Sequence, residues 1–175
     1  MEQISSTYNV IETLSEGQVI QIRAIQPGDR DNLQQAFHQL SGNSIRHRFF
    51  NAKRELTPKE LSYFTEVDFS NHVALVAELV IGESKRLVGV GRFMRLQDQP
   101  GHSEFAITVA DDLQGLGIGK LLLYRLIGCA RDLGISHLDA SMLAQNTGMS
   151  KLLQHTGLSM ESQIEDGVRN VSLTL

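Results

Sequence analysis

Two hydrophobic periods alternate along the chain, and the positions where the period changes mark the ends of its elements. Residues 19–25 alternate apolar with polar side chains, which is typical of a strand. Residues 29–40 carry apolar side chains three and four positions apart, which is typical of a helix with one buried face. These patterns predict strands at 19–25, 73–81, 86–96, 104–110, 136–143, 158–163 and 168–175, and helices at 29–40, 57–67, 117–133 and 148–156.

Cap and turn residues support the ends of these segments. Thr57 can cap a helix, Pro58 fits the first helical position, and Glu60 completes a capping box. Asp166-Gly167 is a hairpin signal between the last two predicted strands.

The resulting order of elements, β-αα-βββ-α-β-α-ββ, predicts the fold class. Three successive strands with turn-rich connections predict an antiparallel meander, and the whole order predicts a mixed sheet with helices on its faces, an α/β or α+β fold. A chain of 175 residues without internal repeats or a linker suits one domain. We therefore expect residues 1–17 to be a loosely specified lead-in and residues 18–175 to form a single domain.

Composition and charge disfavour several classes of protein. Hydrophobic residues make up 41% and charged residues 21%, the balance of a folded globular chain. The formal net charge of -4 disfavours non-specific nucleic-acid binding. The single cysteine, Cys129, allows no internal disulfide, and the six scattered histidines indicate no metal site. No secretory signal or apolar run near the ~18 residues of a membrane span is present, so we expect a cytoplasmic protein without a membrane contact.

The most informative pattern lies in residues 109–120, between a predicted strand and the longest predicted helix. Glycines stand at 115, 117 and 119. Three glycines at alternate positions allow a tight turn with positive φ and leave no Cβ to block a ligand. The helix that begins here presents unpaired N–H groups and the positive end of its dipole, which suits phosphate oxygens. The alternative is a tight strand-to-helix turn that binds nothing.

Two other phosphate-binding motifs do not fit this segment. A Walker loop requires glycine in place of Gln114 and Ser or Thr in place of Leu121. A dinucleotide fingerprint requires glycine in place of Lys120, and it usually opens the first β-α unit of a domain. A nucleotide-binding α/β domain is therefore the weakest of the functional alternatives.

The pattern that remains resembles the acetyl-CoA-binding segment of the GNAT superfamily of N-acyltransferases. Its consensus, Gln/Arg-x-x-Gly-x-Gly/Ala, is matched by Gln114, Gly117 and Gly119. The resemblance extends over residues 19–165, because the order of predicted elements also agrees with that fold.

Within that superfamily, several stretches resemble the catalytic domain of bacterial Pat-type protein lysine acetyltransferases. They are residues 48–50 (Arg-Phe-Phe), 73–77 (Val-Ala-Leu-Val-Ala), 89–93 (Gly-Val-Gly-Arg-Phe) and 104–106 (Glu-Phe-Ala) with 109–115. The sequence contains no counterpart of the regulatory domain often fused to those enzymes, so partner specificity does not carry over.

The resemblance implies a GNAT-like, mostly antiparallel sheet with helices on both faces, in which the parallel strands 104–110 and 136–143 splay apart. The pantetheine arm of acetyl-CoA would enter the gap and pair with the backbone of the first strand, and one N–H would face the thioester oxygen. Acetyl-CoA is the implied co-substrate, without a metal. The implied cofactor-binding residues are Ile107, Thr108, Val109, Gln114, Gly115, Leu116, Gly117, Ile118, Gly119, Lys120 and Asn146.

Glu104 is the candidate catalytic base. A lysine amine has a pKa of ~10.4, so an enzyme working near neutral pH needs a group that removes a proton before attack. Strand alternation places Glu104 on one face with Ala106, Thr108 and Ala110, where small side chains leave room for a substrate. Pat-type enzymes carry their catalytic glutamate at the matching position. A solvent-facing strand glutamate is the alternative.

Three further features leave alternatives open. Asn146 could bond the cofactor arm or cap a helix. Many family members carry a tyrosine general acid where this chain has Leu153, which leaves the acid unassigned. Basic residues 46–48 and 53–54 could bind an anionic acceptor or form a solvated cationic face.

These patterns together predict an N-acetyltransferase that moves acetyl from acetyl-CoA to a primary amine by direct attack in a ternary complex. The acceptor would be a protein lysine or a small amine, and the protein a monomer or homodimer. The alternative is a non-catalytic acyl-CoA sensor that binds partner proteins.

Overall fold

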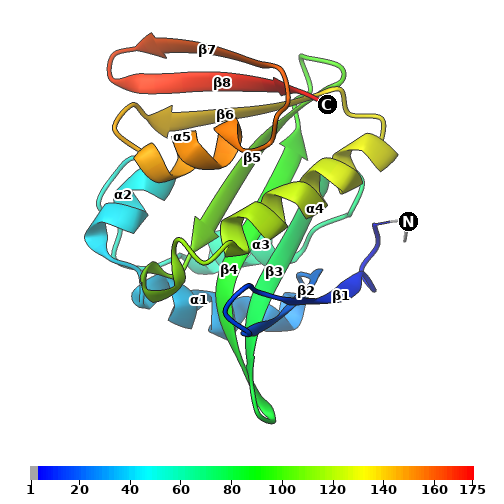
Figure 1. The fold of residues 1–175 in the computed structure, drawn as a ribbon, viewed down its shortest axis with the longest axis vertical. Coiled ribbons are helices and arrows are strands. Elements are labelled where there is room, and N and C mark those ends of the chain that lie inside the picture. Colours follow the sequence, from blue (N-terminus) through cyan, green and yellow to red (C-terminus); the bar gives the residue numbers. More distant parts are fainter. Residues whose placement is uncertain (1–3) are drawn as a thin grey trace.

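One eight-stranded sheet organises the chain (Figure 1). The computed structural model describes residues 4–175. The strands are β1 (Asn9–Thr13), β2 (Val19–Ala24), β3 (His72–Ile81), β4 (Ser84–Arg95), β5 (His102–Val109), β6 (His137–Leu143), β7 (Met160–Glu165) and β8 (Val168–Thr174), and they lie in the order β1-β2-β3-β4-β5-β6-β8-β7. The helices are α1 (Arg30–His38), α2 (Gly42–Phe49), α3 (Pro58–Thr65), α4 (Ile118–Asp132) and α5 (Thr147–Gln154), with short 3-10 turns at Pro27–Asp29 and Asp111–Leu113. The mixed, mostly antiparallel sheet is confirmed.

Helices cover both faces of this sheet, as predicted. Side chains of β3 alternate between two apolar clusters: Val73 and Leu75 join the main core with α4, whereas Ala74 and Val76 face the other side. In Figure 1, α4 crosses the central strands on the near face, and α1 and α3 lie behind them. The predicted capping box of α3 is present, with Thr57 and Glu60 bonding each other's backbone N–H.

β5 and β6 are the parallel pair, and they separate soon after they meet. Their registered pairs run from His102 with His137 to Glu104 with Asp139. Among the described residues, no strand pairs with that edge of β5 beyond Glu104. The predicted splayed pair of parallel strands is therefore confirmed.

Within the predicted lead-in, the described residues 4–17 contain regular structure. β1 pairs antiparallel with β2 at the edge of the sheet, and Tyr8 and Leu14 on either side of it are buried. The sequence did not indicate this strand, because an edge strand is short and only half covered. Its apolar Ile11 is 70% exposed, so the hydrophobic alternation of this segment is incomplete.

Helix α2 was not predicted either. The segment at 41–43 reads as the end of α1, but Ser41 caps a new helix by accepting the N–H of Ser44. α2 has no fully buried residue, so it lacks the apolar stripe by which a helix is recognised in a sequence.

Helix α4 is a core element. Seven of its residues are buried, among them Cys129, and burial raises the pKa of this thiol to about 12. The thiol therefore stays protonated at neutral pH, which agrees with the packing role that its position on the apolar face indicates. Within residues 4–175, no helix combines the length and apolar character needed to cross a membrane.

Two glycines let α4 lie close against β4. A Cβ added at Gly91 would meet Leu126 Cδ1 at 3.0 Å, and one added at Gly89 would meet Leu122 Cδ1 at 3.0 Å. Both leucines are completely buried, so neither has free space into which to move. This close contact fixes the position of α4 on β4, next to β5, which contributes to the candidate site.

The entry to β3 is a polar turn. The Asp68 carboxylate accepts the backbone N–H groups of Ser70, Asn71 and His72 at 3.0, 2.8 and 2.9 Å, which hold the pKa of this carboxyl well below its usual range despite partial burial. His72 is buried, and its Nε2 lies 3.3 Å from Arg92 Nη1. Burial, aided by the charge of Arg92, lowers the pKa of His72 to about 4, so the ring is neutral at pH 7.

Substituting Gly91 should destabilise the protein. We expect Gly91→Ala to lower the free energy of unfolding by about 1–3 kcal/mol, because the added methyl group overpacks against Leu126. The matched control is Gly128→Ala within α4, where nothing lies within 4 Å and helix propensity favours alanine by up to about 1 kcal/mol. Urea denaturation measures both; equal stabilities would contradict the packing argument.

Stability should also fall as the solution is acidified from pH 7 to pH 5. The pKa of His72 is lower in the folded state than its ordinary value near 6.5, so only the unfolded chain binds this proton between those values. The contribution is complete above pH 6.5 and is lost towards pH 4, with a slope of at most about 1.4 kcal/mol per pH unit. His72→Gln should flatten the slope in denaturation curves; an unchanged slope would show that other groups cause it.

Candidate active site

The glycine loop, residues 114–120, has the predicted positive φ at two of its three glycines. Gly115 and Gly117 adopt φ values of +83° and +97°, which strain any other residue. Gly119 differs from the expectation of positive φ, because it already lies inside the first turn of α4. A Cβ at Gly119 would only touch Leu152 and Val109 at 3.6 and 3.7 Å, so the fold itself does not require glycine there.

The first turn of α4 is open to a ligand. Gly117 is its N-cap, and no side chain caps it. The first intrahelical bond is donated by Leu121 to Gly117 O, at 3.0 Å, so the preceding N–H groups are left without helical partners. Ile118 is 1% exposed and anchors this turn in the core. The geometry fits an anionic group such as a diphosphate.

Side chains fasten the loop to its neighbours. Asp111 accepts the backbone N–H and hydroxyl of Ser41 at 3.0 and 2.7 Å and the hydroxyl of Ser44 at 2.7 Å. Asp112 forms a two-pronged ion pair with Arg86, at 2.8 and 2.9 Å. These contacts tie the loop to the N-terminus of α2 and to β4, so it is held in place without a ligand.

The free edge of β5 presents the backbone of only alternate residues. The backbone N–H of Ala110 donates to Val88 O of β4 at 2.8 Å. Along an antiparallel strand, the N–H and C=O groups of successive residues point alternately to one neighbouring strand and to the other, so those of Thr108 point to its partner Val90 on β4. The N–H and C=O groups of Ile107 and Val109 consequently point into the gap left by β6. The backbone of Thr108 thus faces β4 and not the gap, and its side chain lines a pocket.

Gln114 and Lys120 flank the same gap. Gln114 Nε2 donates to Val109 O at 3.1 Å, so its side chain bridges the loop and the strand edge. Lys120 is exposed, and its Nζ lies 5.7 Å from the centre of the Tyr124 ring on the next turn of α4. Gly115 and Leu116 complete the turn between them.

Glu104 occupies the point where the parallel strands separate. It is the last residue of β5 with a partner on β6, Asp139, and its other neighbour is Met94 of β4. Its side chain is exposed and shares a sheet face with Ala106 and Thr108, as strand alternation predicts.

A polar groove runs from Glu104 across β6, β8 and β7. In it His102 Nδ1 lies 2.7 Å from one oxygen of Asp139, and the hydroxyl of Ser172 donates to the other. Glu161 adds a third carboxylate, and the described residues that line the groove include no lysine or arginine. The groove therefore favours a cationic group.

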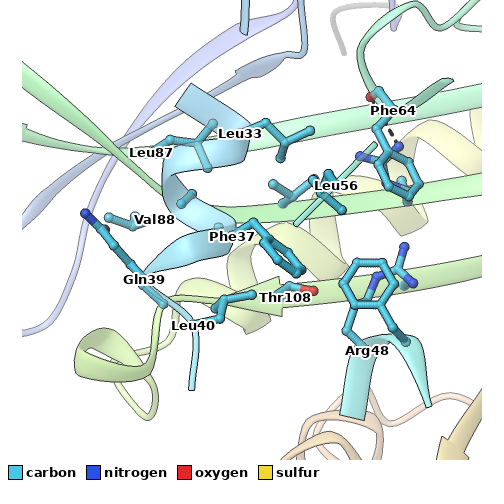
Figure 2. A pocket seen from close by; sticks show the side chains of 17 residues that line it. Leu33, Phe37, Gln39, Leu40, Arg48, Leu56, Phe64, Leu87, Val88 and Thr108 are labelled. Carbon is cyan, nitrogen blue, oxygen red and sulfur yellow. Dashed lines mark hydrogen bonds between the residues drawn. The ribbon is translucent and has the colours of Figure 1, made fainter. Parts of the chain in front are cut away.

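An apolar pocket lies on the same sheet face beside Glu104, between β4, β5 and the first three helices (Figure 2). Its enclosed cavity measures about 60 Å³, and it opens into a cleft whose empty space, solvent included, is about 620 Å³. Its apolar walls include Leu33, Phe37, Leu40, Phe49, Leu56 and Phe64, and its floor is Ala106, Thr108 and Ala110. Arg48 and Arg92 line the end next to Phe64.

The two arginines contact aromatic rings. Arg48 Cζ lies 4.9 Å from the ring centre of Phe49 and 5.9 Å from that of Phe64, and Arg92 Cζ lies 4.5 Å from the Phe64 ring. Arg92 also donates to the backbone oxygen of Phe64 at 3.2 Å. Burial lowers the pKa of both guanidinium groups, that of Arg92 to about 9 with help from the charge of Arg48, and both stay protonated at pH 7.

Two other positions clarify earlier alternatives. Asn146 caps α5 by accepting the N–H of Met149 at 3.1 Å, and its contact with the cofactor arm stays a prediction. Leu153 is 2% exposed in the core, away from any proton-transfer role.

Sequence reasoning did not identify the pocket or Arg92. For the basic residues 46–48 and 53–54 the sequence left open an anion site or a solvated face, and the structure divides them: Arg46 and Arg54 are exposed, whereas Arg48 lines the pocket. For Arg92 a signal existed: an arginine in the middle of a buried strand, beside two glycines, is unusual enough to mark a site. The groove residues His102 and Asp139 carried no such signal.

Comparison with known proteins identifies the family. The sequence model described as Acetyltransferase (GNAT) domain matches residues 20–159. Acetyltransferase PA5475 of Pseudomonas aeruginosa is 29% identical over 159 residues, which cover 91% of this chain and 85% of that protein. Acetyltransferase Pat of Mycolicibacterium smegmatis is 30% identical over 141 residues, 81% of this chain but 41% of that longer protein.

A solved structure agrees with this assignment. The GNAT domain of S. lividans PAT superposes with a TM-score of 0.86 at 28% sequence identity, covering 95% of this chain and 97% of that one. The resemblance to Pat-type enzymes is thus shown in both sequence and structure. The chain belongs to the GNAT family of acyl-CoA-dependent acetyltransferases.

Proposed function

We propose that this protein transfers acetyl from acetyl-CoA to a primary amine by direct attack, with Glu104 as the base. The observation that carries the proposal is the gap between β5 and β6. It opens at Glu104, runs along the edge of β5 at Ile107 and Val109, which has no strand partner there, and ends at the uncapped first turn of α4. One path therefore connects a base, a strand edge and an anion site.

The cofactor would lie along this path. The amides of its pantetheine arm would replace the missing strand and pair with Ile107 and Val109. Its diphosphate would accept from the N–H groups of Gly117, Ile118 and Gly119. The fold itself would tolerate a Cβ at Gly119. The close approach of the diphosphate would therefore be the reason that this position is glycine.

Glu104 would remove the proton that keeps the acceptor amine from attacking. The neutral nitrogen forms a bond to the thioester carbon, the carbon–sulfur bond breaks, and the sulfur leaves as a thiolate. The nitrogen then loses its second proton to water or to the released thiolate, which leaves an amide. A backbone N–H from the free edge of β5 would donate to the carbonyl oxygen as it gains negative charge. Many family members have a tyrosine general acid at the position of Leu153, which is buried here. Because a thiol has a pKa of ~8.5, the thiolate is stable enough to leave without such an acid.

The acceptor would approach through the polar groove. The carboxylates of Glu104, Asp139 and Glu161 attract an ammonium group before it is deprotonated. The likeness to Pat makes a protein lysine one candidate acceptor, and a small amine is the other.

Replacing the base should reduce turnover without affecting cofactor binding. We expect Glu104→Gln to lower kcat about 10²–10⁴-fold in a thiol-release assay, because the amide cannot take up the proton. The affinity for acetyl-CoA should stay within about twofold. Glu165→Gln, an exposed carboxylate at the end of β7, is the matched control. Full activity of Glu104→Gln would assign the base elsewhere.

Reversing the charge at Lys120 should test where the diphosphate binds. Lys120→Glu puts an acidic side chain in the first turn of α4, which stabilises the helix by about 0.3–1 kcal/mol but repels a phosphate. We expect the Kd for coenzyme A, measured by calorimetry, to rise about tenfold or more. The exposed Lys85→Glu, with the same change in net charge, should bind normally. Equal affinities in the two variants would place the diphosphate away from α4.

A further inference from the structure

Two cations in the apolar pocket lack a protein counter-charge. The ion pairs among residues 4–175 engage Arg23, Arg30, Arg86 and Arg125 with carboxylates, whereas Arg48 and Arg92 have none within 4.0 Å. Arg92 is only 9% exposed. Charged groups removed from water are costly unless they are paired, so an unpaired guanidinium at this depth needs an explanation.

The neighbours of these guanidinium groups are neutral. Arg92 contacts the ring and backbone oxygen of Phe64 and the neutral His72, and the Arg48 guanidinium lies near the rings of Phe49 and Phe64. Glu104 acts on Arg48 electrostatically, but from beyond the distance of an ion pair. Neither the rings nor a neutral imidazole carries a negative charge, and Glu104 lies too far away to form an ion pair, so an anionic group of a ligand could pair directly with these guanidinium groups.

The position of the pair next to the proposed base matters. Arg92 faces Ala106 across the β4–β5 ladder, so it is a diagonal neighbour of Glu104, which precedes Ala106 by two residues on β5. Side chains at such diagonal positions lie about 7–8 Å apart at their Cα atoms. A small molecule can therefore contact an arginine with one end and have its reacting atom near Glu104.

We propose that Arg48 and Arg92 form a carboxylate-binding subsite, occupied by a small ligand whose body fills the apolar pocket. A planar guanidinium matches the two oxygens of a carboxylate. A single negative charge is also less costly than a phosphate dianion to bring into walls built from leucine and phenylalanine. This inference rests on the proposed function, because it names the substrate class of the same site.

The carboxylate could enter from either side of the reaction. It could be the α-carboxylate of an apolar amino acid whose amine is the acceptor, with the amine at Glu104 and the side chain in the pocket. It could instead be the distal carboxylate of a dicarboxylic acyl group carried by coenzyme A. Both place the same chemical group between the same arginines.

Matched ligand pairs separate these sources. The first arm titrates the coenzyme A complex with leucine, methionine or phenylalanine, each against the amine that lacks its carboxylate (isoamylamine, 3-methylthiopropylamine or phenylethylamine). The second arm compares succinyl-CoA with butyryl-CoA, which have acyl chains of equal length. We expect the carboxylate-bearing member to bind about tenfold or more tightly in one arm, by calorimetry at fixed ionic strength.

Variants test whether the arginines cause the preference. Arg48→Gln should reduce it to about threefold or less, whereas Arg46→Gln, an exposed arginine on the same helix, should keep it. Circular dichroism and the thermal shift with coenzyme A establish that Arg48→Gln is folded. A preference in the first arm assigns the subsite to the acceptor, and one in the second assigns it to the acyl group.

Two results would overturn the inference. One is the absence of a preference in both arms by a protein that binds coenzyme A, which leaves the proposed function intact. The other is a preference that survives in Arg48→Gln. A wild-type protein that binds no coenzyme A at all would instead overturn the proposed function.

Discussion

The separation of β5 from β6 is the constraint on which the rest of the site depends. β5 is held on one side by its antiparallel ladder with β4, and β6 is held by its ladder with β8, so each strand keeps its own direction after the pair of Glu104 and Asp139. The gap between them leaves backbone groups without protein partners, which is normally unfavourable in a sheet. A fold that keeps such an edge open and places an uncapped helix at its end is arranged for a ligand with amide and phosphate groups.

Charge is divided along this opening. The helix terminus provides partial positive charge at one end, the groove beyond Glu104 collects carboxylates, and the apolar pocket encloses two guanidinium groups. Each region therefore favours a different part of the reacting molecules: an anion, an ammonium group and an apolar body. Glu104 lies where groove and pocket meet, so it can contact a molecule that enters either one.

Much of the fold could be predicted from local patterns, and the site only in part. The capping box at Thr57 and the glycines before α4 have direct steric or hydrogen-bonding reasons that a sequence shows, and they identified the strand-to-helix junction. β1 and α2 were missed because one is an exposed edge and the other has no buried face. The sequence could not decide between the two alternatives for Arg48, because a side chain's direction depends on which helices pack beside it. That information lies in the tertiary structure, not in residue spacing.

The contacts of Asp111 have a thermodynamic consequence. This single carboxylate joins the glycine loop to the first turn of α2, and α2 carries Arg48 at its other end. Any ligand that restricts the loop also restricts the helix that lines the pocket. Binding at the loop and binding in the pocket are then thermodynamically linked, and the linkage acts equally in both directions. A ligand that orders one region reduces the conformational entropy that is lost when the second ligand binds.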